Sequence, residues 1–431
     1  MTRNAIGVGL LGLGTVGGAV AEAITSREQL YAERAGLPLT LRRAVVRDLA
    51  KERSPALRNL PLTTDIDEVL DDPEVRIVVE VIGGEQPARD LIRRALLSGR
   101  HVVTANKEVI AKHGGELRSL AAERGLAVRY EASVGGGIPI ITLLERDLAA
   151  NEITRIAAII NGTTNYMLTR MAREHVTFEQ ALAQAQALGY AEPDPRNDVE
   201  GIDAAYKLAI LASLAYGAHV PPERVHYEGI RKLEPRDFRY AEELGYAIKL
   251  LAVADHAERG VRVRVHPALV SSDAPLAKVD GVFNAIQIEG DLLGPILLQG
   301  RGAGPEPTAS AVVADIVDVA RTLRDECLPR TAAAGANLLE TEPMDTLSAQ
   351  YYVRMTVADS PGVLASVAHV FGEESISIAS VIQKEADEVA GTAEIVIMTH
   401  HARERSLQSA LRTLGSAEPV REIGNCLRVA E

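Results

Sequence analysis

Cysteine is scarce in this chain: only Cys327 and Cys426 occur among 431 residues, far apart in the sequence. Two cysteines cannot build a disulfide framework or a thiolate zinc cluster within one chain, and such sparse use is typical of a reducing compartment. No apolar run reaches the ~20 residues of a membrane span. The apolar run near the N-terminus is broken by glycines, which argues against a signal peptide. We therefore expect a cytoplasmic protein that does not enter a membrane.

An excess of basic residues is also missing. The chain has 46 Lys and Arg against 59 Asp and Glu, a formal net charge of −13. Nucleic acids and anionic membranes bind basic surfaces, so neither is expected as a partner. A local basic pocket for a phosphorylated cofactor is still compatible with this charge. The length suggests two or three domains.

The first third of the chain alternates strand and helix patterns. Strands are predicted at 5–12, 39–46, 75–82 and 101–106, with helical patterns between them. This alternation is typical of βαβ units and of a doubly wound, parallel α/β sheet of the Rossmann type. We place this nucleotide-binding domain at 1–140, completed by a helix at about 308–325.

The rest of the chain has two further patterns. Residues 141–307 combine helical patterns with strand candidates, which predicts an α+β domain. Residues 328–349 contain two prolines and are predicted to be a linker. Residues 350–431 follow the order βαββαβ of a ferredoxin-like domain and are long enough for a core of their own.

A glycine-rich turn follows the first predicted strand. Gly12, Gly14 and Gly17 fit the pattern G-x-G-x-x-G between a strand and a helix, the context in which this motif binds a dinucleotide. The first glycine makes the turn, the second lets a pyrophosphate approach the backbone, and the third lets the helix pack on the sheet. The alternative is a tight turn that binds no ligand.

The end of the second strand bears on the choice between NAD and NADP. An acid about twenty residues past the loop would bind the ribose 2′-hydroxyl of NAD, but Arg47 stands there, with Lys51 close behind. Arg47 and Lys51 could hold a 2′-phosphate, which favours NADP. NAD stays open, because Asp48 could bind a ribose and Arg47 could be a solvated loop charge.

Charged residues crowd the segment 188–207, LGYAEPDPRNDVEGIDAAYK. Asp203 and Lys207 lie four positions apart and therefore share one face of a helix that is otherwise apolar. Lys207 could stabilise the charge on a carbonyl oxygen as a hydride arrives and then supply its proton. The carboxylates could hold a cationic amino group of the substrate. A plain surface ion pair is the alternative.

Two other segments could belong to the same site. Thr104 to Lys107 ends a predicted strand at the carboxyl edge of the sheet, where doubly wound folds bind ligands. Lys107 could add a second charge there or be a solvated lysine at a helix start. The glycine-rich run EASVGGGI at 131–138 exposes carbonyls and could hold a monovalent cation or act only as a hinge.

Several segments together resemble homoserine dehydrogenase over essentially the whole chain. They are GLGTVG (12–17), VVEVIGG (78–84), HVVTANK (101–107), EASVGGGIPI (131–140), INGTTNYML (160–168), GRGAGPEPTAS (300–310) and, most specifically, ALGYAEPDPRNDVEGIDAAYK (187–207). The resemblance implies reversible reduction of L-aspartate 4-semialdehyde to L-homoserine by NAD(P)H, in the biosynthesis of threonine, methionine and isoleucine.

The resemblance also implies roles for individual residues. Lys207 would donate the proton, Lys107 would lie near the reacting carbon, and Asp203 would serve both substrate binding and catalysis. Substrate contacts are implied at Glu192, Asp198, Asp203 and Gly189, and a sodium or potassium site at Glu131, Val134, Gly136 and Ile138, mostly through main-chain oxygens. Cofactor contacts are implied at Leu13, Thr15, Val16, Arg47, Thr104, Lys107 and Gly304, beside Gly12, Gly14, Gly17 and Lys51. Homodimers or homotetramers are expected, with the dimer formed through the second domain.

The C-terminal domain resembles an ACT domain, an amino-acid-sensing module. Asp359-Ser-Pro-Gly362, between its first strand and first helix, resembles the ligand loop of that module. Asp359 and Gly362 are therefore candidate regulatory residues, and the implied effector is threonine. The alternative is a structural module for oligomerisation. A chain cut near Asp345 is predicted to fold, to stay active and to lose its response to threonine.

Two other functions compete with this one. A non-catalytic sensor could bind a dinucleotide and an amino acid, but it would need no proton donor within 187–207. A 2-hydroxy-acid dehydrogenase with an ACT tail would usually pair a histidine with an acid, and no histidine occurs within 187–207. The sequence therefore favours homoserine dehydrogenase.

Overall fold

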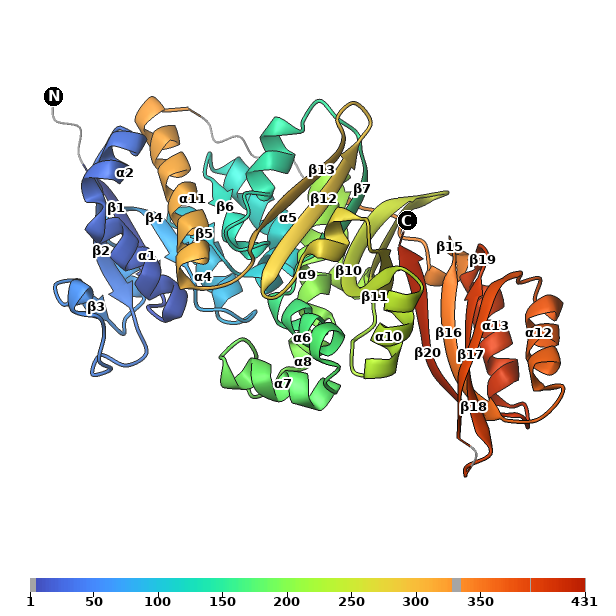
Figure 1. Cartoon of the computed structure of the whole chain (residues 1–431). Helices are drawn as coiled ribbons and strands as arrows, with labels where there is room; N and C mark the ends of the chain where they lie inside the picture. The colour runs from blue at the N-terminus through green and yellow to red at the C-terminus, as the bar shows by residue number, and fades with distance from the viewer. Residues whose placement is uncertain (1–4, 328–334, 388, 431) are drawn as a thin grey trace. The chain divides into compact units, whose positions relative to one another are not determined.

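The computed structural model describes residues 5–327, 335–387 and 389–430 (Figure 1). By contacts the chain divides into two compact units, the first made of Met1–Thr154, Tyr206–Arg224 and Ile288–Leu339, the second of Arg155–Ala205, Val225–Gln287 and Glu340–Glu431. The C-terminal region thus shares a unit with part of the middle of the chain. Within the described residues, no helix is long and apolar enough to cross a membrane.

A six-stranded parallel sheet organises the first unit. Its order is β3-β2-β1-β4-β5-β6, and every neighbouring pair is parallel. The strands are β1 (Ile6–Leu11), β2 (Leu39–Val45), β3 (Leu62–Thr63), β4 (Val75–Glu80), β5 (His101–Thr104) and β6 (Val128–Arg129). This confirms the doubly wound sheet that the alternating pattern predicts.

Helices pack on this sheet. They are α1 (Thr15–Ser26), α2 (Glu28–Ala35), α3 (Asp67–Leu70), α4 (Ala88–Leu97), α5 (Lys107–Glu123) and α11 (Pro305–Asp325), with short 3-10 helices η1 (Pro55–Leu57), η2 (Glu131–Ser133) and η4 (Pro222–Arg224) and a π-helix η3 (Leu143–Asp147). The helix expected at about 308–325 is α11, which begins earlier because proline suits the first helical position. Val312 and Ile316 of α11 join Val8 and Leu10 of β1 in one core.

A mixed sheet organises the second unit, in the order β12-β7-β10-β11-β20-β16-β18-β17. The strands are β7 (Ile153–Ile159), β10 (Tyr246–Ala257), β11 (Gly260–Ser271), β12 (Phe283–Gly290), β16 (Tyr351–Ala358), β17 (Ile378–Asp387), β18 (Thr392–Thr399) and β20 (Val420–Ala430), and β9 (His226–Tyr227) pairs with β11. The helices are α6 (Gly162–Glu174), α7 (Phe178–Ala187), α8 (Arg196–Val199), α10 (Pro235–Glu243), α12 (Val363–Glu373) and α13 (Glu404–Gly415), with the turn η5 (Pro275–Lys278). Helix α9 (Ile202–Ala215) leads into the first unit, and β13 (Gly294–Arg301) follows β12 there.

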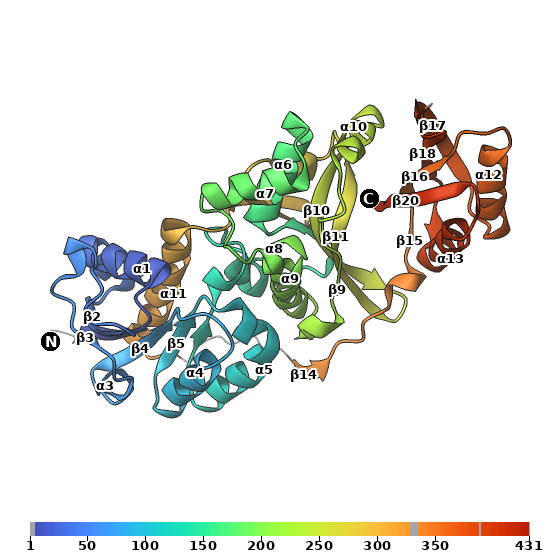
Figure 2. The ribbon, with the colours of Figure 1, turned by 90° about the horizontal axis from the view of Figure 1, so that it is seen from below.

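The C-terminal region has the order β16-α12-β17-β18-α13-β20, which confirms the predicted βαββαβ pattern. Figure 2 shows α12 and α13 on the same side of its strands, as in Figure 1. Its core contains Val353, Phe371 and Leu407 of this region, together with Leu347 and Ala349 just before it. Its last strand nevertheless pairs in parallel with β11, Ala268 opposite Arg428, so the sheet of this region continues into the preceding domain.

The segment predicted as a linker is partly ordered into strands. β14 (Gly335–Leu338) pairs with β8 (Ala218–His219), and β15 (Ser348–Ala349) pairs with β19 (Ala402–Arg403), with the turn η6 (Met344–Thr346) between them. The predicted linker thus contains two short paired strands within 335–349, so backbone pairing holds both ends of this stretch. Its first part, 328–334, lies outside the described residues.

Candidate functional site

The glycine loop between β1 and α1 has the geometry that a dinucleotide needs. Gly12 has a φ of +103°, a conformation that favours glycine. A Cβ atom at Gly17 would lie 2.2 Å from the carbonyl oxygen of Gly12, so this position is closed to larger residues. A Cβ at Gly14 would meet nothing within 4 Å, and this open backbone beside the start of α1 fits a pyrophosphate. Leu13 and Val16 of the same loop are half-buried, and Thr15 is exposed.

The loop after β2 carries Arg47, Asp48 and Lys51, the charged residues considered for binding the adenosine end of the cofactor. The Asp48 carboxylate accepts a hydrogen bond from the Ala50 amide at 2.8 Å, and so closes a turn of its own loop. The Arg53 guanidinium donates to the carbonyls of Asp48 and Lys51, each at 2.6 Å. Arg47 and Lys51 are exposed beside this ordered turn. Asp48 is thus engaged in the loop, whereas the Arg47 side chain extends into solvent.

A buried polar network shapes the carboxyl ends of β4 and β5. Glu80 is fully buried and accepts hydrogen bonds from the Ile82 amide at 2.8 Å and from the Thr104 hydroxyl at 2.6 Å. The Asn106 amide group donates to the Gly84 carbonyl at 2.7 Å, while its oxygen caps α5 at the Val109 amide. Lys107 begins α5 and is half-buried.

Glu80 and Asn106 had no role in the sequence-based site, although both lie in motifs already noted. The available signal was a carboxylate at the end of an otherwise apolar strand, since a buried charge at such a place is rare without a partner. Their hydrogen bonds fix the loop after β4 against the start of α5. They therefore position the backbone at the sheet edge where the cofactor is expected.

An ion-pair cluster beside α5 fixes the start of α9 in the first unit. The Lys112 ammonium lies 2.7 Å from Glu85 and 2.8 Å from Glu108, and 5.6 Å from the centre of the Tyr206 ring. Hydrogen bonds from Lys112 and His113 lower the pKa of Glu85 to about 2. Lys207, the predicted proton donor, follows Tyr206 directly and is half-buried. The Lys112 ammonium thus contacts the ring of the residue that directly precedes Lys207 in α9.

Two of the predicted acids are brought together in the second unit. One side-chain amide, that of Asn161, donates to Asp198 at 2.7 Å and to Asp203 at 2.9 Å. Asp203 is buried and Asp198 half-buried. Gly201, with a φ of +85°, makes the tight turn between α8, which carries Asp198, and α9, which carries Asp203.

The remaining predicted substrate residues lie on the loop that precedes α8. Glu192 and Gly189 are exposed, on the loop between α7 and α8. The Glu192 carbonyl accepts a hydrogen bond from the Gln186 side chain at 3.1 Å. The structure thus brings Asp198 and Asp203 together through Asn161 and places Glu192 and Gly189 on the loop that precedes α8.

The glycine-rich segment after β6 is compact and buried. The Glu131 carboxylate accepts hydrogen bonds from the Ile141 amide at 2.7 Å and from the Thr142 amide at 2.9 Å, while Asp315 of α11 accepts the Glu131 amide at 2.9 Å. Burial and the charge of Glu131 hold the pKa of Asp315 well above its usual value. The Glu131 side chain thus anchors the segment, so a cation here would rely on main-chain oxygens.

The backbone of this segment approaches the loop before α11 closely. A Cβ at Gly136 would lie 2.4 Å from the Gly302 carbonyl oxygen, and Gly136 has a φ of +56°. Val134 and Ile138 are buried, and Gly304 precedes α11 as its N-cap. Carbonyl oxygens of this kind are suitable ligands for a hard cation. No three His, Cys, Asp or Glu side chains gather as a metal site within the described residues, and a main-chain site needs none.

The candidate regulatory loop is exposed at the start of α12. Gly362, with a φ of +96°, is the N-cap of this helix. The Asp359 amide donates to the Gly391 carbonyl at 2.9 Å, which fixes the loop against the turn after β17. Both residues are solvent-exposed.

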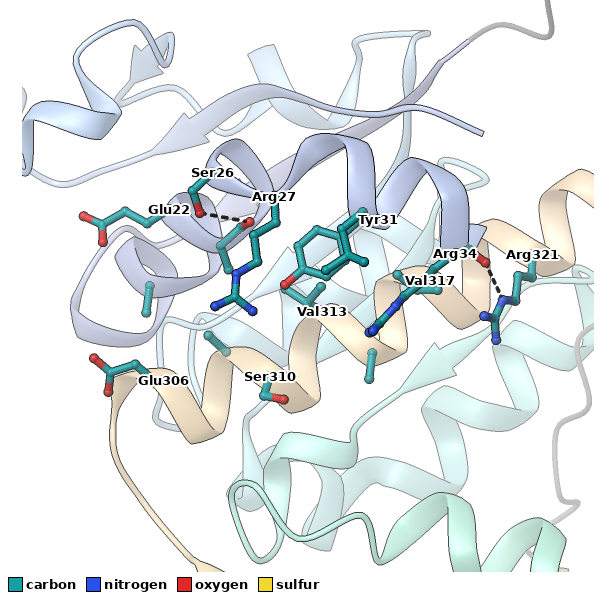
Figure 3. Close-up of a pocket in the computed structure, with 15 residues that line it drawn as sticks. Glu22, Ser26, Arg27, Tyr31, Arg34, Glu306, Ser310, Val313, Val317 and Arg321 are labelled. Carbon is teal, nitrogen blue, oxygen red and sulfur yellow. Dashed lines mark hydrogen bonds between the residues drawn. The ribbon is translucent and has the colours of Figure 1, made fainter. Parts of the chain in front are cut away.

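A cavity of about 640 Å³ lies between α1, α2 and α11 (Figure 3). Tyr31, Val313 and Val317 are among the side chains along it, and Arg27 and Arg321 also line it. None of the predicted site residues lines this cavity. It is therefore separate from the glycine loop.

Three family models match successive parts of the chain. Residues 12–131 match the model of the homoserine dehydrogenase NAD-binding domain, residues 139–317 match the homoserine dehydrogenase model, and residues 351–419 match the ACT domain. The chain is 44% identical to a homoserine dehydrogenase of Pseudomonas aeruginosa over 420 residues, 96% of either protein. It is 39% identical to that of Bacillus subtilis over 429 residues, 99% of this chain and 98% of the relative.

Solved structures similar to this one are also homoserine dehydrogenases. A homoserine dehydrogenase from Thiobacillus denitrificans has a TM-score of 0.94 at 44% identity, with 99% of either chain covered. A mutant of a hyperthermophilic archaeal homoserine dehydrogenase, solved in complex with NADPH, has a TM-score of 0.64 at 32% identity and covers 74% of this chain and 98% of its own.

Proposed function

The chain belongs to the homoserine dehydrogenases, and from that premise we propose how its residues reduce L-aspartate 4-semialdehyde to L-homoserine. Family membership confirms the predicted NAD(P)-dependent oxidoreductase over the non-catalytic sensor. The observation that carries the proposal is the Asp198–Asn161–Asp203 cluster, one helical turn before Lys207 in α9.

In this proposal Lys207 is the general acid. The nicotinamide, when bound, supplies a hydride to the aldehyde carbon. The carbonyl oxygen then gains negative charge, which the Lys207 ammonium stabilises before it donates the proton. In the reverse direction the neutral Lys207 amine accepts that proton from the homoserine hydroxyl. Lys107 adds positive charge near the reacting carbon.

The two aspartates bind the other end of the substrate. The α-ammonium group of the semialdehyde is a cation, and carboxylates are its natural partners. Asp203 and Asp198 hold it, and Glu192 and Gly189 contribute from the loop between α7 and α8. Holding the amino end fixes the distance from the aldehyde carbon to Lys207, since the substrate chain is short.

Substitution of Lys207 tests this assignment. Lys207→Met should lower kcat by ~10²–10⁴-fold, the usual contribution of a general acid, and leave the Kd for NADPH unchanged. The exposed Lys278→Met serves as the matched control. A Lys207→Met enzyme that keeps more than about a tenth of normal turnover would exclude this role and favour Lys107 as the donor.

We further propose that NADP(H) is the preferred cofactor, with NAD(H) bound more weakly. Exposed Arg47 and Lys51 would bind the 2′-phosphate, while Asp48 is engaged in its own turn. The archaeal relative solved with NADPH supports this preference. Arg47→Ala should weaken NADPH by ~1.5–3 kcal/mol and leave NADH nearly unchanged, with the exposed Arg58→Ala as control. Equal weakening of both cofactors would contradict the assignment.

Threonine is the proposed effector of the ACT domain. The exposed loop at Asp359 and Gly362 precedes α12, whose first amide groups could meet an amino-acid carboxylate. Threonine titration of activity should show inhibition that Asp359→Ala removes and that the exposed Asp345→Ala keeps. A full-length enzyme insensitive to threonine would instead make the domain a structural module.

Three further parts of the proposal concern the cation, the assembly and the compartment. Sodium or potassium would bind the carbonyls around Val134 and Gly136, so activity should fall when both ions are replaced by tetramethylammonium.

The exposed side chains of Leu292, which is 77% exposed, and its neighbour Leu293 suit a contact in a homodimer or homotetramer. Light scattering would measure the oligomeric state. A cytoplasmic location would keep both free cysteines reduced.

A further inference from the structure

We propose that Asn161 is a positioning residue, whose side-chain amide holds the carboxylates of Asp198 and Asp203 in a fixed relation to one another. The inference rests on the substrate role proposed above for these two acids. Asn161 follows β7 and precedes α6, so it comes from a third element, distinct from the two helices that carry the acids. It does not need to touch the substrate to act.

Both N–H groups of the Asn161 amide are used. One donates to Asp198 Oδ1 at 2.7 Å and the other to Asp203 Oδ2 at 2.9 Å. Each carboxylate therefore has one oxygen committed to the same amide. This arrangement fixes the separation of the two acids to the width of a single amide group.

The orientation of the amide follows from its partners. Asn161 Oδ1 accepts from the Thr164 backbone amide at 2.8 Å and from the Thr164 hydroxyl at 2.9 Å. A backbone amide can only donate, and an ionised carboxylate can only accept. The Asn161 oxygen must therefore face Thr164 and its nitrogen must face the acids. Asn161 is 4% exposed and Thr164 1%, so water does not compete for these bonds.

The chemistry of the site explains why an amide suits this place. Two carboxylates at short range repel each other, more strongly where burial lowers the local dielectric constant. A lysine or arginine at this position would relieve the repulsion, but it would also compete with the substrate ammonium for the acids. A neutral amide donates one hydrogen bond to each acid and leaves their negative charge for the substrate.

The competing explanation is that Asn161 only caps α6. Asparagine, aspartate and serine are about equally good N-caps, so substitution separates the two roles. Capping alone predicts that Asn161→Asp and Asn161→Ser behave like the parent enzyme. Positioning predicts that Asn161→Asp is the worse of the two, because it places a third carboxylate against Asp198 and Asp203, while Asn161→Ser only removes the donors.

The test measures the KM for homoserine, kcat, the Kd for NADPH and the thermal midpoint of the full-length enzyme. We expect the homoserine KM to rise about tenfold or more in Asn161→Asp, as for a lost hydrogen bond to a charged group, with a smaller rise in Asn161→Ser. The Kd for NADPH should not change. Thr177→Ala, which removes the N-cap of α7 in the same unit, is the control for cap loss and should leave the homoserine KM unchanged.

The outcomes distinguish the positioning role of Asn161 from the substrate role proposed for Asp198 and Asp203. A homoserine KM equal to that of the parent enzyme in both Asn161 variants, with Asp203→Asn raising it, would overturn the positioning role alone. An unchanged KM in Asp203→Asn would overturn the substrate role of the acids and the positioning role with it. If Asn161→Asp fails to fold, the comparison of Asn161→Ser with Thr177→Ala decides, and equal KM values in those two would overturn the inference.

Discussion

Replacement of Arg354 by methionine should strongly destabilise the second unit. Arg354 of β16 is 1% exposed, and its guanidinium lies 2.6 Å from Asp237 and 3.1 Å from Glu394. Asp237, in α10, is fully buried and also accepts hydrogen bonds from the Tyr352 hydroxyl and the Asn425 amide. A charged network thus joins α10 to the C-terminal strands; its centre at Arg354 and Asp237 is buried, and the half-buried Glu234 and Arg236 extend it.

The magnitude follows from the charges that the substitution leaves behind. Burial opposes the charge of Arg354, yet its contacts with Asp237 and the charge of Glu234 together outweigh burial and raise the pKa of Arg354 above its ordinary value. Methionine is apolar and of similar reach, so little packing is lost. The Asp237 carboxylate would stay buried after losing its ion pair with Arg354, while Glu394 would keep its ion pair with Arg236 at 2.9 Å. Breaking a buried pair in this way costs ~3–5 kcal/mol of the free energy of unfolding.

Urea unfolding measures this cost, with circular dichroism and enzyme activity as two probes of the transition. The matched control is Lys384→Met, since the Lys384–Glu243 ion pair also joins the C-terminal domain to α10. That pair is exposed, 58% and 36% for its two side chains, so its loss should cost ~0–1 kcal/mol. If Arg354→Met costs no more than Lys384→Met, the buried network does not hold the domains together.

The other predictions concern the first unit. Burial lowers the pKa of His101 to about 4, and its ring nitrogen Nδ1 accepts a hydrogen bond from the Ala127 amide. The unfolded chain binds this proton near pH 6.5, so the free energy of unfolding should fall by about 3 kcal/mol as pH drops from 6.5 to 4. His101→Asn keeps an acceptor and should flatten that slope in pH-dependent urea titrations. Gly17→Ala forces a Cβ to within 2.2 Å of the Gly12 carbonyl, which should cost ~1–3 kcal/mol and weaken NADPH binding, whereas Gly18→Ala, whose Cβ meets nothing within 4 Å, should cost nothing.

Local patterns were sufficient for the first sheet and the C-terminal order, because each strand there is followed by a turn or helix signal in the sequence. Helix α10 and the long strand β10 were not predicted, although Gly245, with a φ of +82°, marks the turn between them. Asn161 likewise had no predicted role, since its partners lie 37 and 42 positions away. A hydrogen bond between such distant residues depends on tertiary packing and leaves no local period to detect.

Contacts between distant residues also affect the predicted outcome of truncating the chain near Asp345. The C-terminal domain has its own core, as expected, but the pairing of β20 with β11 at Ala268–Val270 was not visible in the sequence. A cut near Asp345 would uncover that edge of β11, and unpaired strand edges promote aggregation. It would also expose Asp237 without Arg354. Loss of the threonine response after such a cut would therefore not separate regulation from damage to the catalytic sheet. The exposed Asp359 lies outside this network, so its substitution is the cleaner way to test regulation.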